Sequence, residues 1–325
     1  MHRLEEALNV DESSIRLSLP HRRDPDAEKL VAQMTAAGQP PLSQLGVEGA
    51  RAYLEEKAAA VVGPEMDLCV DEMIPMEGSE VPARIYGATR FAAQPVVVYL
   101  HGGGWVIGSV AASDPFCRRL AQAADCVVVS VDYPLAPEHP FPAAVLSAIA
   151  AIKWASDSAK EWGGDPERLV VLGDSAGGNL AAVAVRHILE QDACPVARQI
   201  LAYPGTSADR NGDSSPFGDE WPLASSDRAW YIEKYLPNGL PYNDPDVAPL
   251  LADASGMPPT TLLLGGCDPL AGEGLLYASH LWDAGVSVDL HMFSGQIHGF
   301  LTFDENVLPR SREALGVVAN AIRTA

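Results

Sequence analysis

The pattern of apolar and polar positions changes at about residue 66. Before that point, residues 26–37 and 43–60 each carry apolar side chains at helical spacing, and the turn residues 38–41 separate them. After it, short apolar runs alternate with longer helical patterns. The pattern therefore predicts an N-terminal helical segment, residues 1–65, followed by a strand-rich domain, residues 66–325.

The second part of the chain is predicted to alternate between strands and helices. Pro82 has no N–H to donate to a neighbour, so the strand that contains it is expected near an edge of the sheet. The alternation indicates an α/β fold with a mostly parallel central sheet and helices on both faces. The predicted strands are 67–74, 81–86, 95–100, 126–131, 168–172, 197–203, 260–265 and 286–293, and the predicted helices are 113–124, 143–156, 179–189, 273–284 and 310–323.

Residues 205–250 interrupt this alternation. The stretch contains Trp221, Trp230, Tyr231 and Tyr235 among many turn residues. Such aromatic side chains either pack against the domain or form part of a substrate-pocket wall. We expect the stretch to be a cap or pocket-wall insertion.

The charge balance excludes several partners. With 43 acidic against 22 basic residues, the formal net charge is −21. Nucleic-acid phosphates and anionic membrane surfaces would both repel such a chain. No stretch reaches the ~20 apolar residues that span a bilayer. We therefore expect no nucleic-acid partner and no stable membrane insertion.

The cysteines and the N-terminus indicate a reducing compartment. Five cysteines form no paired spacing and are expected to be free thiols, three of them in or beside apolar runs. The first six residues, 1–6, are charged and lack the apolar core of a signal peptide. The sequence predicts a cytoplasmic protein, either a monomer or a homodimer.

The stretch Gly173-Asp174-Ser175-Ala176-Gly177 lies between an apolar run and a helix rich in small residues. A serine between two glycines at a strand-to-helix turn is the pattern of a nucleophile elbow. The turn is sharp, and a side chain at either glycine would crowd the strand or the helix. Ser175 is therefore predicted to be a nucleophile raised above the edge of the sheet.

Two more motifs are predicted to lie at the same edge. His101-Gly102-Gly103-Gly104-Trp105 follows the strand 95–100, and three consecutive glycines there indicate backbone that approaches a ligand. Asp268 and His298 follow the predicted strands 260–265 and 286–293, and open α/β sheets bind ligands at the carboxyl ends of their strands. The order serine, aspartate, histidine is that of the α/β-hydrolase triad.

With these motifs, the sequence resembles the hormone-sensitive-lipase family of α/β-hydrolase esterases over nearly its whole length. The resemblance implies hydrolysis of carboxylic esters with short or medium acyl chains, with neither cofactor nor metal. It also implies that the N-terminal helices and the insertion form a cap over the site. The motifs that carry it are His101-Gly102-Gly103-Gly104-Trp105, the run 132–142 (DYPLAPEHPFP), Gly173 to Asn179, Asp268-Pro269-Leu270 and His298-Gly299-Phe300.

The expected mechanism gives each residue a role. His298 takes the Ser175 proton as the hydroxyl attacks the ester carbonyl, and Asp268 holds the imidazole and stabilises the imidazolium. Water activated by the same histidine then hydrolyses the acyl-enzyme. The oxyanion is expected to receive hydrogen bonds from three backbone N–H groups, those of Gly103, Gly104 and Ala176.

Two positions depart from the family pattern, and two alternatives remain open. Pro134 replaces a usual arginine, and Gly272 replaces a usual acidic residue, but neither belongs to the triad. His101 and Asp174 are expected to orient the oxyanion loop and the elbow. The alternatives are an amidase or deacetylase with the same triad and a non-catalytic small-molecule receptor on the same fold. The presence of His298 argues against the receptor.

Overall fold

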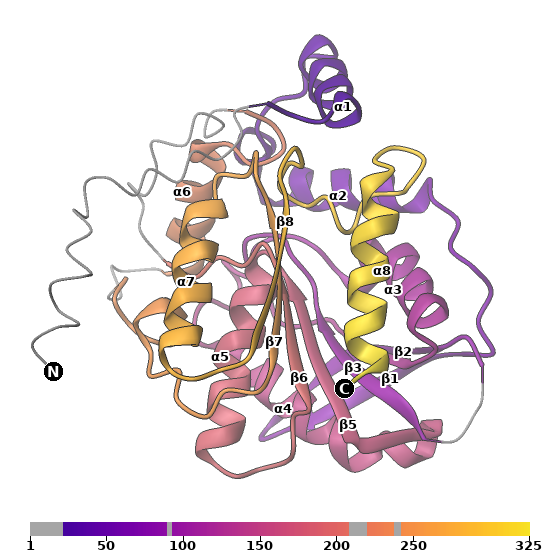
Figure 1. Cartoon of the computed structure of the whole chain (residues 1–325). Coiled ribbons are helices and arrows are strands. Elements are labelled where there is room, and N and C mark those ends of the chain that lie inside the picture. The colour runs from indigo at the N-terminus through magenta and orange to yellow at the C-terminus, as the bar shows by residue number, and fades with distance from the viewer. Residues whose placement is uncertain (1–21, 90–92, 208–219, 237–241) are drawn as a thin grey trace, which may run out of the picture.

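The computed structural model describes residues 22–89, 93–207, 220–236 and 242–325 (Figure 1). Within these ranges one sheet of eight strands has the order β1-β2-β4-β3-β5-β6-β7-β8. The charged N-terminus 1–6 and parts of the segments 1–65 and 205–250 lie outside the described residues.

The sheet is mixed but mostly parallel, as the alternation predicted. β1 pairs antiparallel with β2, and β2 antiparallel with β4, whereas all pairings among β3 to β8 are parallel. The strands are β1 (Leu68–Met76), β2 (Ser79–Gly87), β3 (Gln94–Leu100), β4 (Val127–Val131), β5 (Gly164–Asp174), β6 (Arg198–Ala202), β7 (Thr260–Gly265) and β8 (Val288–Phe293).

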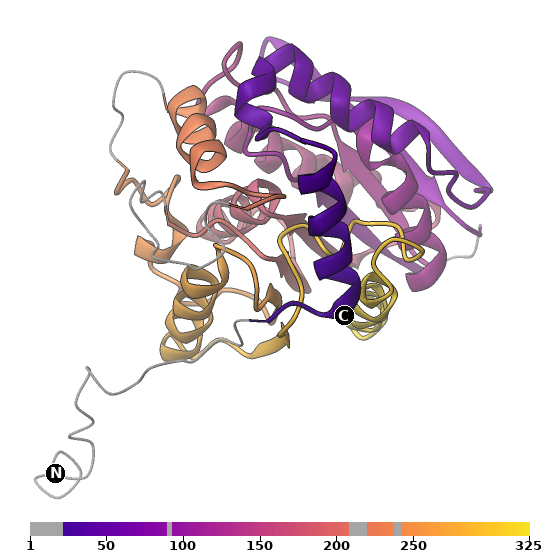
Figure 2. The same cartoon turned by 90° about the horizontal axis from the view of Figure 1, so that it is seen from above.

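Helices cover both faces of this sheet. α3 and α8 lie on one face, and α4, α5 and α7 lie on the other (Figure 1). α1 and α2 cross the upper end of the molecule, as the view from above shows (Figure 2). The helices are α1 (Pro25–Ala36), α2 (Gly46–Ala59), α3 (Val110–Ala124), α4 (Ala143–Ser158), α5 (Ala176–Glu190), α6 (Ser225–Tyr235), α7 (Ala271–Asp283) and α8 (Arg310–Arg323).

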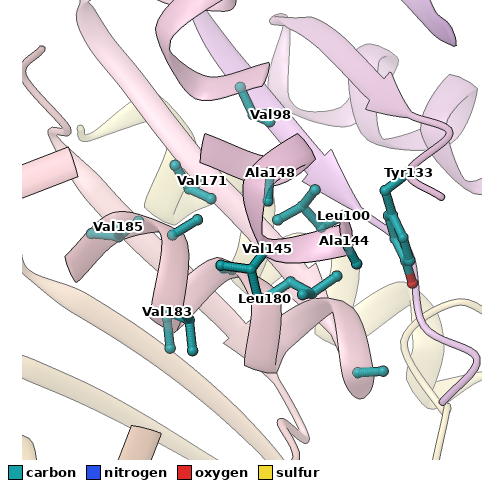
Figure 3. Close-up of a cluster of buried hydrophobic side chains, with 14 of the residues drawn as sticks. Val98, Leu100, Tyr133, Ala144, Val145, Ala148, Val171, Leu180, Val183 and Val185 are labelled. Atoms are coloured by element: carbon teal, nitrogen blue, oxygen red, sulfur yellow. The ribbon is translucent and has the colours of Figure 1, made fainter. Parts of the chain in front are cut away.

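The alternation of side chains along the central strands creates two apolar layers. In β3, Val98 and Leu100 pack toward α4 and α5, whereas Val97 and Tyr99 pack toward α3 and α8. Every residue of β3 is buried because a parallel strand is covered on both faces. Figure 3 shows the first layer, where Val171 of β5 joins Val98 and Leu100.

Two local predictions need adjustment. The strand predicted at 168–172 begins earlier, because β5 also includes residues 164–167, and a register irregularity between Gln94 and Val96 accommodates them. The single helix predicted over 43–60 is a short 3₁₀ turn (Leu42–Leu45) followed by α2, and Gly46 joins them with a φ of 69°.

The strand that contains Pro82 is indeed near an edge, as the second strand of the sheet. Pro82 pairs with Met73 of the edge strand β1, and its carbonyl accepts a hydrogen bond from the Asp132 N–H at 2.9 Å. The missing N–H of Pro82 is tolerated because the residue lies near the edge of the sheet, before the part of β2 that pairs with β4. None of the helices in the described part of the chain is both long and apolar enough to cross a bilayer.

Candidate active site

The structure brings Ser175, His298 and Asp268 into one hydrogen-bonded chain. The Nε2 atom of His298 lies 2.8 Å from Oγ of Ser175, and its Nδ1 atom lies 2.8 Å from Oδ2 of Asp268. The other oxygen of Asp268 accepts the Leu270 N–H at 2.8 Å, and the residue is only 2% exposed. The carboxylate is thus fixed, and it orients the imidazole toward the serine.

Ser175 occupies a strained position between β5 and α5. Its φ of 54° and ψ of −119° lie in a region that non-glycine residues rarely adopt. The Ser175 N–H donates to the Ala202 carbonyl of β6 at 2.9 Å, which holds the turn onto the sheet. A Cβ on Gly177 would lie 1.9 Å from the Leu100 carbonyl oxygen, so only glycine fits there. Both observations match the elbow that the sequence predicted.

The glycine loop after β3 lies beside the elbow. The Gly103 carbonyl accepts the N–H groups of Val106 and Ile107, at 3.1 and 3.0 Å, which closes a tight turn. Gly104 has a φ of 59°, and a Cβ there would lie 2.2 Å from the Tyr231 ring of α6. Gly103, Gly104 and Ala176 line the same cavity as Ser175. Within the described residues, their backbone N–H groups donate to no acceptor of the protein.

Asp174 joins this loop to the elbow. Its Oδ1 atom accepts hydrogen bonds from the Tyr99 hydroxyl at 2.7 Å and from the Gly102 N–H at 2.8 Å. Burial raises the pKa of the Asp174 carboxyl because it removes water from the charged form. These contacts connect the loop after β3 to the elbow, and the orienting role predicted for Asp174 stays a prediction.

His101 is a second support of the loop. Its ring stacks on Tyr133 with centroids 4.3 Å apart, and its Nδ1 atom lies 2.8 Å from the Gly102 carbonyl. Burial lowers the pKa of His101, which favours the neutral ring with a proton on Nδ1. The Tyr133 hydroxyl donates to the His101 carbonyl at 2.7 Å. Both buried side chains therefore contact the backbone of the loop.

A cavity of about 360 Å³ opens over Ser175. Its wall is mostly apolar and is built from stretches far apart in the sequence. α2 contributes Leu54 and Ala58, and α3 contributes Phe116. α6 contributes Tyr231 and Ile232. The site is therefore a concave apolar pocket with a few polar groups at its base, the usual form of a small-molecule site.

Sequence reasoning missed several charged residues of this wall, among them an ion pair. Arg228 of α6 lies 3.2 Å from Glu273 of α7, with Nη2 facing Oε2, and Glu273 also accepts the Thr206 N–H at 2.7 Å. All these groups are half-buried or buried, and they tie the insertion to the strand ends. No local motif marks them, because Arg228 and Glu273 meet only in the folded chain.

The buried cysteines do not compete with Ser175 as nucleophiles. All five are free, and Cys117, Cys126 and Cys267 are buried, as expected for three of them. Burial raises the pKa of the Cys267 thiol to about 11. A neutral buried thiol is a poor nucleophile.

Comparison with known proteins defines the class. Residues 97–302 match the model of a family described as having the alpha/beta hydrolase fold. The esterase of Pyrobaculum calidifontis has a similar structure, with a TM-score of 0.86 and 35% identity over 93% of this chain and 98% of that one. The chain therefore belongs to the α/β-hydrolase fold family.

Individual relatives identify the family within this fold more closely. A carboxylesterase of Mycobacterium tuberculosis is 38% identical, over 86% of this chain and 90% of its own length. An ethyl acetate hydrolase of Pseudomonas putida is 34% identical, over 87% of this chain and 92% of its own length. Together they confirm the predicted membership of the hormone-sensitive-lipase family of esterases, and the protein is a serine-carboxylesterase-like hydrolase.

Proposed function

We propose that this protein hydrolyses carboxylic esters with short to medium acyl chains through an acyl-enzyme on Ser175. His298 is the general base for attack and the general acid for departure of the alcohol, and Asp268 keeps its imidazole in the useful tautomer. Water then attacks the acyl-enzyme with the same histidine as base. The proposed oxyanion donors are three backbone N–H groups, those of Gly103, Gly104 and Ala176.

One observation carries this proposal. His298 lies at 2.8 Å from both Ser175 Oγ and Asp268 Oδ2. A nucleophile, a base and a group that orients the base are therefore connected by hydrogen bonds. These are hydrogen-bond distances, which proton transfer requires. A receptor that only bound a ligand would not need this alignment.

The size and lining of the cavity support the acyl range. Its volume of about 360 Å³ is near the lower end of the roughly 300–1,000 Å³ of ligand pockets. Apolar side chains of α2 and α6 favour an aliphatic acyl or alcohol group. An ethyl acetate hydrolase among the relatives supports the same range.

We also propose that the N-terminal segment 1–65 and the insertion 205–250 form a cap over a catalytic domain, residues 66–325. In their described parts, α2 and α6 both contribute to the wall of the cavity. Covering the site in this way excludes water from the reacting groups and limits the length of the acyl chain.

The first test concerns the nucleophile. Ser175→Ala should fold normally and lose hydrolysis of p-nitrophenyl butyrate by about 10⁴-fold or more, leaving only the contribution of binding and the oxyanion donors. An organophosphate should label the wild-type protein at Ser175 alone. Labelling at another serine in mass spectrometry, with Ser175 unmodified, would contradict the proposal.

The second test separates ester from amide cleavage. We expect hydrolysis of p-nitrophenyl esters from acetate to hexanoate, with little cleavage of the matched anilides. Faster cleavage of an anilide than of its ester would assign the protein to the amidases. Binding of the esters without turnover would assign it to the receptors.

A further inference from the structure

The N-terminal segment touches more than the cavity. Its described part, residues 22–65, begins at a loop that precedes His298 and crosses to the loop that follows β3. The resemblance implies that this segment is part of a cap over the site. Two charged residues, Arg51 and Asp24, indicate a further role.

Arg51 of α2 bridges the two backbone segments that support the oxyanion loop. Its Nε atom donates to the Val106 carbonyl at 2.9 Å, and its Nη2 atom donates to the Ala136 carbonyl at 3.1 Å. Its Nη1 and Nη2 atoms also donate to the two carboxylate oxygens of Glu138, at 2.9 and 2.8 Å. A planar guanidinium can satisfy all these acceptors at once, which a lysine cannot.

The residues that Arg51 holds are directly connected to the proposed oxyanion donors. The Val106 N–H donates to the Gly103 carbonyl at 3.1 Å, and the Ala136 N–H donates to the Trp105 carbonyl at 2.9 Å. Val106 and Ala136 are fully buried. A shift of Val106 would therefore move the turn that presents the N–H groups of Gly103 and Gly104.

Asp24 makes a similar connection to the histidine loop. Its N–H donates to the Gly295 carbonyl at 2.9 Å, and its Oδ2 atom accepts the Gln296 side-chain amide at 2.8 Å. The Gln296 carbonyl accepts the Cys267 N–H at 2.9 Å. Gln296 is 1% exposed and lies two residues before His298, and Cys267 directly precedes Asp268.

We propose that Arg51 and Asp24 make the N-terminal segment a brace, which positions the oxyanion loop and the loops of His298 and Asp268. This inference rests on the proposed function, since it assigns a task to those loops. The brace acts through backbone, so Arg51 and Asp24 are positioning residues that never touch the substrate. Because a misplacement of about 1 Å can lower a rate by about 10²-fold, such support affects turnover directly.

The brace and a simple lid predict different kinetics. Loss of a lid lowers kcat/KM for substrates with long acyl chains and leaves kcat/KM for p-nitrophenyl acetate unchanged. Loss of the brace lowers kcat on every substrate, acetate included, because the oxyanion donors act in the transition state and contribute little to binding of the ester.

The experiment compares Arg51→Met with Arg84→Met, a matched control. Arg84 also forms a bidentate pair, with Asp71, and its side chain is 30% exposed against 27% for Arg51. On p-nitrophenyl acetate, Arg51→Met should lower kcat by about tenfold or more with KM within about twofold. Arg84→Met should retain the wild-type kcat.

Two further variants identify the contact that matters. Glu138→Gln removes the ion pair and keeps the two bonds to backbone carbonyls, so it should retain most of the wild-type kcat. Arg51→Lys keeps the charge and loses the fork, so its kcat should lie between those of Arg51→Met and the wild type. Arg51→Lys also serves as the test if Arg51→Met does not fold.

Asp24 is tested against Asp26, an exposed aspartate of the first turn of α1. Asp24→Ala should lower kcat on acetate, and Asp26→Ala should not. Melting temperatures well above the assay temperature would exclude a purely structural loss.

The outcomes separate the two proposals. If the wild-type protein shows no esterase activity, or Ser175→Ala keeps it, the proposed function fails. If activity depends on Ser175 but kcat on acetate is unchanged in both Arg51→Lys and Asp24→Ala, only the brace is overturned.

Discussion

At the scale of single residues, Asp174 combines two demands that oppose each other. Its Oδ1 atom accepts hydrogen bonds from Tyr99 and Gly102, and the residue is buried. Burial raises the pKa of its carboxyl because the charged form loses its water. Ionising the Asp174 carboxyl therefore costs stability, while its acceptor oxygen holds the loop.

This conflict gives a pH-dependent prediction for Asp174→Asn. The amide oxygen can accept both bonds on the side of Oδ1, and the variant has no charge. The folded wild type binds more protons than the unfolded chain from ~3.9, the ordinary aspartate pKa, up to its raised folded value. Wild-type stability therefore falls as pH rises through this window, and the loss is complete above the folded pKa.

The measurement is the difference in Tm between Asp174→Asn and the wild type from pH 4 to pH 8. We expect the variant to gain on the wild type as pH rises, by about 2 °C or more, since a stability change of about 1 kcal/mol shifts Tm by this amount in a chain of this size. A difference that stays constant or shrinks with rising pH would show that burial does not raise the Asp174 pKa.

At the scale of elements, the loop between β3 and α3 depends on contact with the insertion. The Tyr231 ring of α6 fills the space where Gly104 would carry a side chain, so the loop and α6 fix each other. Gly104→Ala should lower kcat/KM by about 10²-fold or more, because it displaces a proposed oxyanion donor.

Gly78→Ala is the matched control for Gly104→Ala. Gly78 has a φ of 75° in the turn between β1 and β2, and no atom lies within 4 Å of a Cβ placed there. It therefore carries the backbone strain without the collision. Equal loss of activity in both variants would attribute the effect to general destabilisation, so Tm should be measured for both.

At the scale of the whole molecule, the cavity forms where distant parts of the chain meet. α2, α3, α6 and the loop after His298 each form one wall, so the length of substrate that fits is a property of the assembled molecule. Ala58 of α2 lies in this wall, and its neighbour Ala59 is exposed and does not line the cavity.

Ala58→Trp tests this wall, with Ala59→Trp as control. The indole should fill part of the cavity and lower the ratio of hexanoate to acetate kcat/KM by about tenfold, since about 0.8 kcal/mol of binding is lost for each methylene that can no longer be buried. Ala59→Trp should keep the wild-type ratio. If both variants keep it, the acyl chain does not lie against α2.

The sequence by itself determined the order of the strands and helices outside residues 205–250, and most of their bounds to within a few residues, but it did not predict α6. Apolar spacing places β7 and α8 at the predicted residues, because local periodicity depends on neighbours in the chain. The elbow at Ser175 was also visible, since the turn needs glycines on both sides of the serine. Asp268 and His298 could also be identified, because each follows the end of a predicted strand, and the order of elements along the chain is enough to show this.

Only the tertiary structure decided which distant side chains meet. Arg51 and Val106 are 55 positions apart, and Asp24 and Gln296 are 272 apart, so no local pattern links them. The pairing of Arg228 with Glu273 and the place of residues 164–166 in β5 likewise depend on neighbouring elements. Such contacts form when whole layers pack, and this packing converts a recognisable set of motifs into a particular cavity with its own supports.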